Sequence, residues 1–387
     1  MSESGAEQTL ICEECAWMMT VPAGVPPSLL RNDCPECGKG VSLAPKAEKD
    51  EMSQQSEQIH VSFDFLPPPF DDEDIDRLDI VDPLEQDKGR HRPWTGFANR
   101  ITPVILASQI CADMERSGIN VDENLIDRFS EIGKKYRKAL RAAEDMQDIS
   151  RGMRLSDGFP EESAKSVRRF SRTYLGADSN KRAFEEGGLA QTLGLISVEL
   201  HQTDDEDTIV VRTTDTGERA LKIPLHRHLE VTKEKHNAAL AGDVSIPKWV
   251  PDSGVAKILT IIESRSNGEY LWIKFLLVQV NSQIQGLDVE GMIERETERE
   301  IKDGSLRRWF ERGKDVPIVD DYRKRGASDE EILDALEDKI KSTITGTLGR
   351  MKEMALIFQF KKARKTYYKT TKLGRDWAVK MDSFDNV

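Results

Sequence analysis

The sequence predicts a mainly α-helical protein with small β elements, divided into several units. Beyond Trp94, apolar residues recur at the spacing of three and four that one face of a helix requires. Two distant stretches, residues 188–223 and 346–381, repeat one order of helix, strand, polar loop, strand and helix. The length of 387 residues leaves room for two or three compact units, and residues 1–93 differ in composition from the rest.

The charge balance restricts the classes of function that the chain can serve. It contains 56 Lys and Arg against 69 Asp and Glu, a formal net charge of −13. A basic coat over the whole chain is therefore excluded, and any surface that binds a polyanion must be local. The most apolar stretch, residues 270–280, contains Lys274 and is too short to cross a bilayer, so no membrane partner is expected. The acidic N-terminus does not resemble a signal peptide, and we expect a cytoplasmic location.

Residues 1–45 contain two CxxC pairs. Cys12 and Cys15 form the first, and Cys34 and Cys37 form the second, with 18 residues between the pairs. Each pair lets two thiolates reach one ion from a tight turn, and two such turns complete a tetrahedral four-sulfur site. The spacing therefore predicts a zinc ribbon with a structural Zn²⁺ rather than a redox motif. The flanking acidic residues favour a protein surface as its contact, while nucleic acid stays open as an alternative.

Residues 46–93 lose helical periodicity, contain three consecutive prolines at 67–69 and are rich in Asp and Glu. This composition predicts an acidic flexible linker. Apolar side chains such as Phe63, Phe65 and Leu66 interrupt the acidic run. Docking of the segment on a basic or apolar surface is therefore the alternative to a solvated tether.

Residues 94–225 are predicted to form a helical region that includes the first repeated stretch. One apolar helix face collects Ile105, Ile110, Cys111 and Met114. A turn at Ser117 and Gly118 follows, and Asp122 is predicted to cap a long helix that ends near Met146. Cys111 falls on the apolar face, so we expect a buried structural cysteine.

The two repeated stretches share their local sequence signals. A helix ends at an apolar triplet, residues 194–196 in one copy and 355–357 in the other, and the second strand leads into Thr-Thr-x-x-Gly. This order resembles the recognition helix and wing of a winged helix-turn-helix domain. Combined with the zinc ribbon, the chain resembles archaeal-type transcription factors and regulators at the level of domain content. The resemblance implies two winged helix-turn-helix units that bind DNA or proteins.

Residues 313–387 are predicted to form the second, basic winged unit. Ser328 and Glu331 form a capping-box pattern that opens a helix ending near Lys339. A second helix is predicted from about residue 342 to 354, after a short polar turn. In winged helix-turn-helix domains this helix enters the major groove, and the resemblance assigns base contacts to Thr343, Thr347 and Arg350. The first copy departs from the pattern because Gly187 and Gly188 weaken its corresponding helix.

Charge separates the two hairpins. Between Arg350 and Arg375 there are nine Lys or Arg and one acidic residue. The predicted phosphate contacts at the second hairpin tip are Lys361, Lys362, Arg364 and Lys365, with Tyr367 and Lys369 as further DNA-binding candidates beside them. Such a tip suits the phosphate backbone or a minor groove. A solvated hairpin whose lysines serve solubility is the alternative. The first tip, residues 204–207, is entirely acidic, so this copy is expected to hold a protein partner or a second protomer, or to serve as scaffold.

Residues 226–312 are predicted to form a helical connector whose core includes Trp249, Trp272 and Trp309. His226, His228 and His236 lack the neighbouring ligands of a metal motif and are expected to be solvated or locally hydrogen bonded. The sequence contains no P-loop, nucleophile elbow, zincin motif or dinucleotide fingerprint. We therefore expect a protein that is not an enzyme.

These patterns favour a DNA-binding protein, a transcription regulator or factor, that binds duplex DNA through its C-terminal winged helix. The zinc ribbon, linker and first winged helix would then recruit a protein such as polymerase or a complex subunit. A homodimer is compatible with this function. The alternative is a structural docking subunit of a larger protein or nucleoprotein complex.

Overall fold

The computed structural model describes residues 8–11, 18–21, 33, 42–43, 59–84, 94, 98–147, 154–181, 183–185, 187–202, 207–223, 225, 227–231, 252–283, 285–303, 322–362 and 365–383. The chain forms two compact units, Met1–Glu57 and Gln58–Val387. In the first unit, strands β1 (Gln8–Ile11), β2 (Met18–Val21) and β3 (Ser42–Leu43) form an antiparallel sheet in the order β2-β1-β3. The four predicted zinc ligands, Cys12, Cys15, Cys34 and Cys37, lie outside the described residues.

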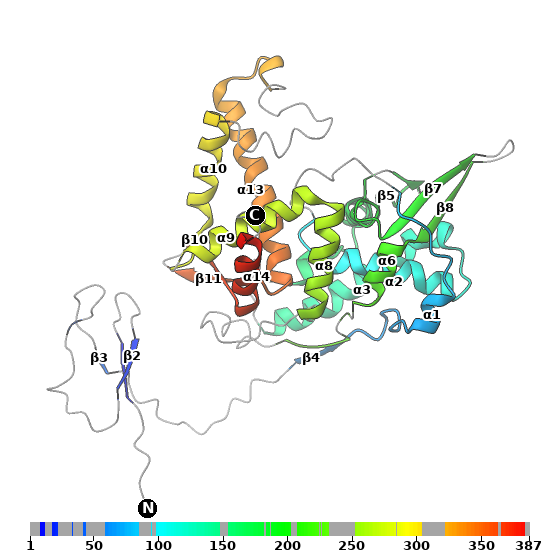
Figure 1. Cartoon of the computed structure of the whole chain (residues 1–387), viewed down its shortest axis with the longest axis horizontal. Helices are drawn as coiled ribbons and strands as arrows, with labels where there is room; N and C mark the ends of the chain where they lie inside the picture. Colours follow the sequence, from blue (N-terminus) through cyan, green and yellow to red (C-terminus); the bar gives the residue numbers. More distant parts are fainter. Residues whose placement is uncertain are drawn as a thin grey trace, which may run out of the picture. The chain divides into compact units, whose positions relative to one another are not determined.

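The second unit is mainly helical with small β elements, as the sequence predicts (Figure 1). Its first half contains β4 (Ile59–Ser62), α1 (Asp72–Asp76), α2 (Thr102–Arg116), α3 (Val121–Met146), the 3₁₀ turn η3 (Ser156–Gly158), α4 (Ala164–Tyr174), β5 (Ala177–Asp178), β6 (Ala183–Phe184), α5 (Leu189–Thr192), β7 (Ile196–Gln202), β8 (Asp207–Thr213), α6 (Asp215–Leu221) and β9 (His228–Val231). Its second half contains α8 (Asp252–Arg265), α9 (Asn267–Ser282), β10 (Leu287–Asp288), α10 (Val289–Asp303), α13 (Asp329–Glu353), β11 (Ile357–Lys362), β12 (Lys365–Thr370) and α14 (Lys372–Ser383). Among the described residues, no helix has both the length and the apolar composition needed to cross a membrane.

Helix α2 lies at the centre of the first half, and its residues 102–112 are all buried. The predicted apolar face of this helix is confirmed, and Cys111 is fully buried. Burial raises the pKa of the Cys111 thiol well above its usual range. The predicted cap of α3 is wrong, because the side chain of Asn120 accepts the backbone N–H groups of the first turn. The carboxylate of Asp122 instead accepts the backbone N–H of Val211 in β8, at 2.6 Å.

The described part of the predicted linker, residues 59–84, is packed against the helical body. Strand β4 pairs antiparallel with β9, and the ring of Phe63 stacks on Tyr136 with a centroid separation of 4.3 Å. Further along, Ile75 and Leu78 form a small apolar cluster with Ala112 and Leu221. The prediction of a flexible tether is therefore wrong for these residues, since the apolar side chains among the acids are used for burial.

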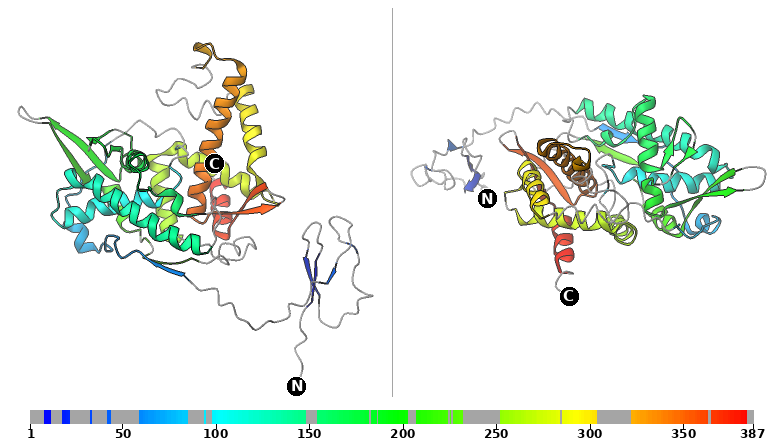
Figure 2. Two further views of the ribbon diagram at one scale, coloured as in Figure 1. Left: turned by 180° about the vertical axis from the view of Figure 1, so that it is seen from behind. Right: turned by 90° about the horizontal axis from the view of Figure 1, so that it is seen from above.

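The two repeated stretches both form a helix, a β-hairpin and a helix, as predicted (Figure 2). They also share the hydrogen bonds of their turns. Gly194 and Ala355 both end a helix with positive φ, 61° and 54° respectively. After each hairpin a threonine caps the closing helix: Thr214 accepts from the N–H of Gly217, and Thr371 from that of Gly374. The hydroxyls of the two threonines also donate to the carbonyls of Gly194 and Ala355. The two stretches of similar sequence therefore form the same pair of threonine hydrogen bonds.

The helix before each hairpin differs from the prediction. In the first copy α5 has only four residues, because it begins after Gly187 and Gly188. In the second copy the capping box of Ser328 and Glu331 is confirmed, but α13 then continues without a turn for 25 residues. Its N-terminal part pairs side by side with α10 as a projecting two-helix arm (Figures 1 and 2). Ile332, Leu336 and Ile340 are buried along α13, so the apolar spacing passes through the predicted turn and the helix does not break.

Candidate nucleic-acid interface

The basic hairpin belongs to a three-stranded antiparallel sheet in the order β10-β12-β11. Strands β11 and β12 pair from Ile357 opposite Thr370 to Lys362 opposite Lys365 and so form an antiparallel hairpin. Strand β10 closes the other edge of β12, with Leu287 opposite Tyr368. The helices α9, α13 and α14 pack around this sheet. The described strands of the hairpin thus belong to a packed sheet.

The described cations of the hairpin lie at its surface. Lys365 is exposed and lies 3.5 Å from Asp288 of β10, a contact that is worth little in solvent. The ammonium group of Lys369 lies over the ring of Phe360, which also stacks on Tyr367 at 5.6 Å. The side chains of Lys361 and Lys362, and the whole of Arg364, lie outside the described residues, although the register places Lys361 and Lys362 at the end of β11. In α14, Lys372 and Arg375 are also exposed.

Lys352 counts among the basic residues of this region in the sequence but faces the interior of the fold. Its ammonium group donates to Gln359 of β11 at 2.8 Å and lies over the ring of Tyr368. Burial, followed by the positive charge of Arg100, lowers the pKa of Lys352 to about 7. Lys352 therefore contributes less to the basic surface than the sequence count implies.

The predicted base-reading face of α13 is wrong. Thr343, Thr347 and Arg350 are exposed by only 2%, 0% and 0%, so none of them faces a groove open to DNA. Thr347 and Arg350 contact Glu269 of α9, and Arg350 also contacts the carbonyl of Ala98. Gly349 allows a close approach to the carbonyl of Asn99. The helical spacing that places these residues together on one face is correct. That face is covered by residues that come much earlier in the sequence.

Arg350 forms a buried ion pair with Glu269 of α9. Its Nη2 lies 2.7 Å and its Nε 2.9 Å from Oε1 of Glu269, and both side chains are fully buried. The backbone N–H of Trp94 donates to the other carboxylate oxygen at 2.8 Å, and the guanidinium group lies over the Trp94 ring. Burial raises the pKa of the Glu269 carboxyl, and the charge of Arg350 opposes this shift. The positive charge of Arg350 is thus paired inside the fold and does not contribute to the basic surface.

Sequence reasoning missed several buried carboxylates that join the two halves of the body. Glu353 of α13 accepts the backbone N–H groups of Ile101 and Thr102, at the start of α2, which has no cap of its own. Glu269 follows Ser266 in an S-x-x-E pattern that signals a capping box, yet its carboxylate binds Arg350 instead. Local patterns therefore contained a signal for Glu269 but not for its distant partner.

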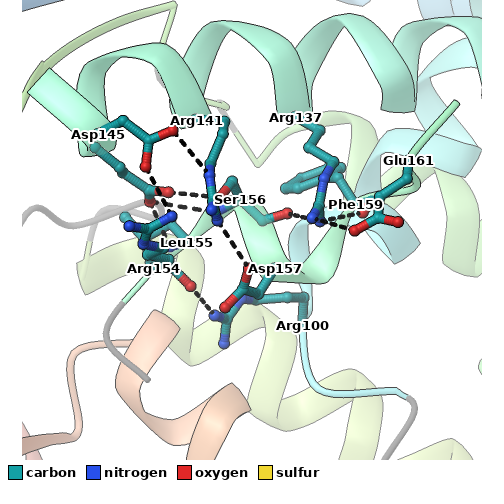
Figure 3. Close-up of polar contacts among 11 residues, drawn as sticks. Arg100, Arg137, Arg141, Asp145, Arg154, Leu155, Ser156, Asp157, Phe159 and Glu161 are labelled. Carbon is teal, nitrogen blue, oxygen red and sulfur yellow. Dashed lines mark hydrogen bonds and ion pairs between the residues drawn. The ribbon is translucent and has the colours of Figure 1, made fainter. Parts of the chain in front are cut away.

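A second polar network holds the loop before α4 (Figure 3). The buried carboxylate of Glu144 accepts the backbone N–H groups of Leu155 and Ser156. Arg137 donates to the carbonyls of Ser156 and Phe159 and lies 2.8 Å from Glu161. These contacts fix the loop as one wall of an open cleft with a volume of about 480 Å³.

The remaining predicted residues fall in different places. His228 is exposed in β9, and Trp272 is buried as predicted, whereas His226, His236, Trp249 and Trp309 lie outside the described residues. Over the described ranges, no group of three or more His, Cys, Asp or Glu side chains is arranged to hold a metal ion.

Comparison of the chain with protein-family models, with curated proteins and with solved structures finds no match. The inference of function therefore depends on the geometry and charge of the chain itself.

Proposed function

We propose that the chain binds duplex DNA by placing the β11–β12 hairpin against the phosphate backbone. The observation that carries this proposal is the local reversal of charge. Residues 357–380 contain eight Lys or Arg and one acidic residue, Asp376, in a chain of net charge −13. Phosphate contacts provide most of the affinity of such surfaces and need a local excess of cations.

The topology around the hairpin supports a winged helix-turn-helix unit. Among the described elements, α10 and α13 come before the β11–β12 hairpin, and β10 pairs with β12, which is compatible with the predicted recognition helix and wing. Lys365 of this hairpin is exposed, whereas the predicted reading face of α13 is buried. The expected contact is therefore with the backbone or the minor groove and has weak sequence preference.

For the N-terminal unit, we propose a structural zinc site. The register places Ile11, Met18 and Ser42 at the same end of the sheet of β1, β2 and β3. The first CxxC pair, Cys12 and Cys15, connects β1 to β2 there, and the second pair, Cys34 and Cys37, precedes β3. This connectivity suits a structural zinc site. In this proposal the zinc ribbon recruits a protein such as polymerase or a complex subunit, and the chain acts in the cytoplasm as a non-enzymatic transcription regulator or factor.

The experiment is duplex-DNA binding by the full chain over a salt series. The test variant changes Lys361, Lys362, Arg364 and Lys365 to Ala. The control variant changes four exposed cations elsewhere, Lys138, Lys181, Arg219 and Lys257, to Ala, and so alters the net charge equally. If the hairpin makes about four phosphate contacts, the slope of log K against log salt falls by roughly 3–4 in the test variant only. Equal slopes in both variants contradict the proposal.

A second candidate function, a docking subunit of a larger complex, is favoured by the two-helix arm of α10 and α13. The exposed surface of the arm is strongly acidic, with Glu290, Glu294, Glu298, Asp329, Glu330, Asp334, Glu337 and Asp338. DNA would be repelled by this surface, whereas a basic protein would be attracted. Absence of duplex binding by the unmodified chain at low salt would favour this function.

A further inference from the structure

Strand β7 lies at the edge of its sheet. Among the described residues this sheet has two strands, β7 and β8, which pair from Ile196 opposite Thr213 to Gln202 opposite Asp207. The β7–β8 hairpin projects from the helical body (Figures 1 and 2). A two-stranded ribbon is only marginally stable by itself in water, and an edge strand is a template for pairing with a further strand.

The opposite edge of the hairpin, along β8, has partners within the fold. The backbone N–H of Val211 donates to the carboxylate of Asp122 at 2.6 Å, and that of Thr213 donates to Glu115 at 2.8 Å. The carbonyl of Thr213 accepts the backbone N–H of Val81 at 3.2 Å. At these positions the fold itself therefore satisfies the backbone groups of β8 that point away from β7.

The same contacts fix which backbone groups of β7 point outward. Residues opposite each other in an antiparallel pair either exchange both hydrogen bonds or direct their N–H groups away from each other. Val211 and Thr213 direct theirs away from β7, so their opposite residues, Val198 and Ile196, direct theirs away from β8. Leu200 does the same by the alternation of the strand. Over the part of the chain that the structure describes, no group accepts the outward N–H of Val198.

The sequence of β7 lacks the features that usually protect an edge strand. Such strands are commonly blocked by lysine, by proline or by a β-bulge. Strand β7 reads Ile-Ser-Val-Glu-Leu-His-Gln, and its register with β8 is continuous. Its one acidic residue, Glu199, accepts the hydroxyl of Ser197 at 3.0 Å. The edge is therefore suited to pairing with another strand.

The charge pattern favours an antiparallel pair with the β7 strand of a second copy. Residues 204–207, which follow β7 in the sequence, are all acidic. A parallel pair would bring the ends of both β7 strands, and so both acidic sequences, to the same end of the sheet, where they would repel each other. An antiparallel pair sends the two strand ends in opposite directions. It also has the two-fold symmetry that most dimers have.

The outward N–H groups limit the register of this pair. Each even-numbered position must face an even-numbered position of the second copy, so the two-fold axis passes at residue 198, 199 or 200. An axis at Glu199 places two carboxylates directly opposite each other, which is unfavourable, and an axis at Val198 places Glu199 opposite Ser197. An axis at Leu200 places Glu199 of each copy opposite His201 of the other. Two complementary polar pairs then form, so this register is favoured.

We propose that the chain forms a homodimer in which β7 pairs antiparallel with β7 of a second copy, with Leu200 opposite Leu200, so that the two hairpins form one four-stranded sheet. The contact area of two edge strands is small, and the dimer is expected to be weak. The proposal does not depend on DNA binding by the β11–β12 hairpin.

The test is sedimentation equilibrium of the full chain, without DNA, at concentrations up to about 100 μM. Val198→Pro removes an outward N–H and leaves the β7–β8 hydrogen bonds in place, so the Kd of the dimer should rise at least about tenfold. Ile209→Pro is the matched control, because the same alternation directs its N–H outward from β8, on the other edge. The control should leave the Kd unchanged, and urea denaturation should give the two proline variants the same midpoint.

Two charge variants test the register. His201→Glu places a carboxylate opposite Glu199 of the second copy and should also raise the Kd about tenfold. Adding Glu199→Lys to that variant should restore dimerisation, because each new lysine faces a new glutamate.

A chain that stays monomeric up to about 100 μM overturns the proposal, whether or not another protein then binds it. Equal dimerisation of the Val198→Pro and Ile209→Pro variants also overturns it. A dimer that Val198→Pro disrupts but His201→Glu leaves intact contradicts the register centred on Leu200. Because DNA is absent from these measurements, a failure of the proposed DNA binding does not change their outcome.

Discussion

Arg350 counts as a positive charge in the sequence, but its buried pair with Glu269 removes that charge from the surface of the protein. A buried ion pair adds little net stability, because desolvation cancels most of the attraction. Removal of one partner is different, since the other charge is left buried without compensation. Arg350 also donates to the carbonyl of Ala98 and packs on Trp94, so several contacts depend on it.

We predict that Arg350→Met lowers the free energy of unfolding by about 3–5 kcal/mol, because the Glu269 carboxylate loses its counter-ion inside the fold. Urea denaturation of the variant and the unmodified chain measures this difference. Arg375→Met, which changes an exposed arginine of α14, is the control and should cost less than about 0.5 kcal/mol. An Arg350→Met protein with unchanged stability and weakened DNA binding would restore the base-reading role that its burial argues against.

At the scale of elements, the two helix-hairpin-helix copies depend on a close approach between the closing helix and the turn before the hairpin. A Cβ added at Gly374 would lie 1.8 Å from the carbonyl oxygen of Leu356, and one at Gly217 would lie 2.1 Å from that of Leu195. The obstacle is backbone in both copies and cannot rotate away. The Thr-Thr-x-x-Gly signal therefore reflects one capping threonine and one glycine that permits contact.

We predict that Gly374→Ala destabilises the chain by more than about 1 kcal/mol, although alanine is the better helix former. The matched control is Gly291→Ala in α10, where the nearest atom to a new Cβ is the flexible Arg295 side chain at 3.4 Å. That substitution should be neutral or stabilising by up to about 1 kcal/mol. Thermal unfolding of both variants compares them. Equal effects at the two positions would refute the close-approach explanation.

The helices and hairpins were easier to predict from the sequence than the long-range contacts that surround them. The helical face of α2, the capping box at Ser328 and both hairpins follow from local spacing, because each depends on residues within a few turns of one another. The burial of Arg350 depends on Glu269 and Trp94, far away in the sequence, and no local pattern encodes that contact. The unbroken α13 was missed because polar residues near position 341 resemble a turn when the packing of α10 is unknown.

Residues 59–84 also make contacts with distant parts of the chain that local sequence could not predict. Its acidic composition predicts a solvated linker, and composition cannot tell which apolar side chains will find a partner. Phe63 is fully buried against Tyr136, and Val81 forms a parallel bridge to Thr214 beside β8. The β-hairpin that contains the basic candidate residues follows from local spacing, and its contact with DNA stays a prediction. The cleft beside α4 could not be predicted, because its residues meet only in the folded chain.

At the scale of the whole molecule, the N-terminal unit is expected to depend on metal. A segment of 57 residues is short for a stable hydrophobic core, and a structural zinc would add stability to its three-stranded sheet. We predict one zinc per chain by elemental analysis of the purified protein. Changing Cys12 and Cys34 to Ser should abolish it, and Cys111→Ala should not. Zinc that persists in the double variant would contradict the four-cysteine site.

The charge distribution of the molecule predicts that DNA contacts the β11–β12 hairpin and not the buried face of α13. Hydrogen-exchange mass spectrometry of the full chain, with and without a random duplex at low salt, tests it most directly. We predict added protection in peptides covering residues 357–375 and unchanged exchange in peptides covering 342–353. Protection confined to residues 342–353, or none in the hairpin at saturating DNA, would contradict the claim.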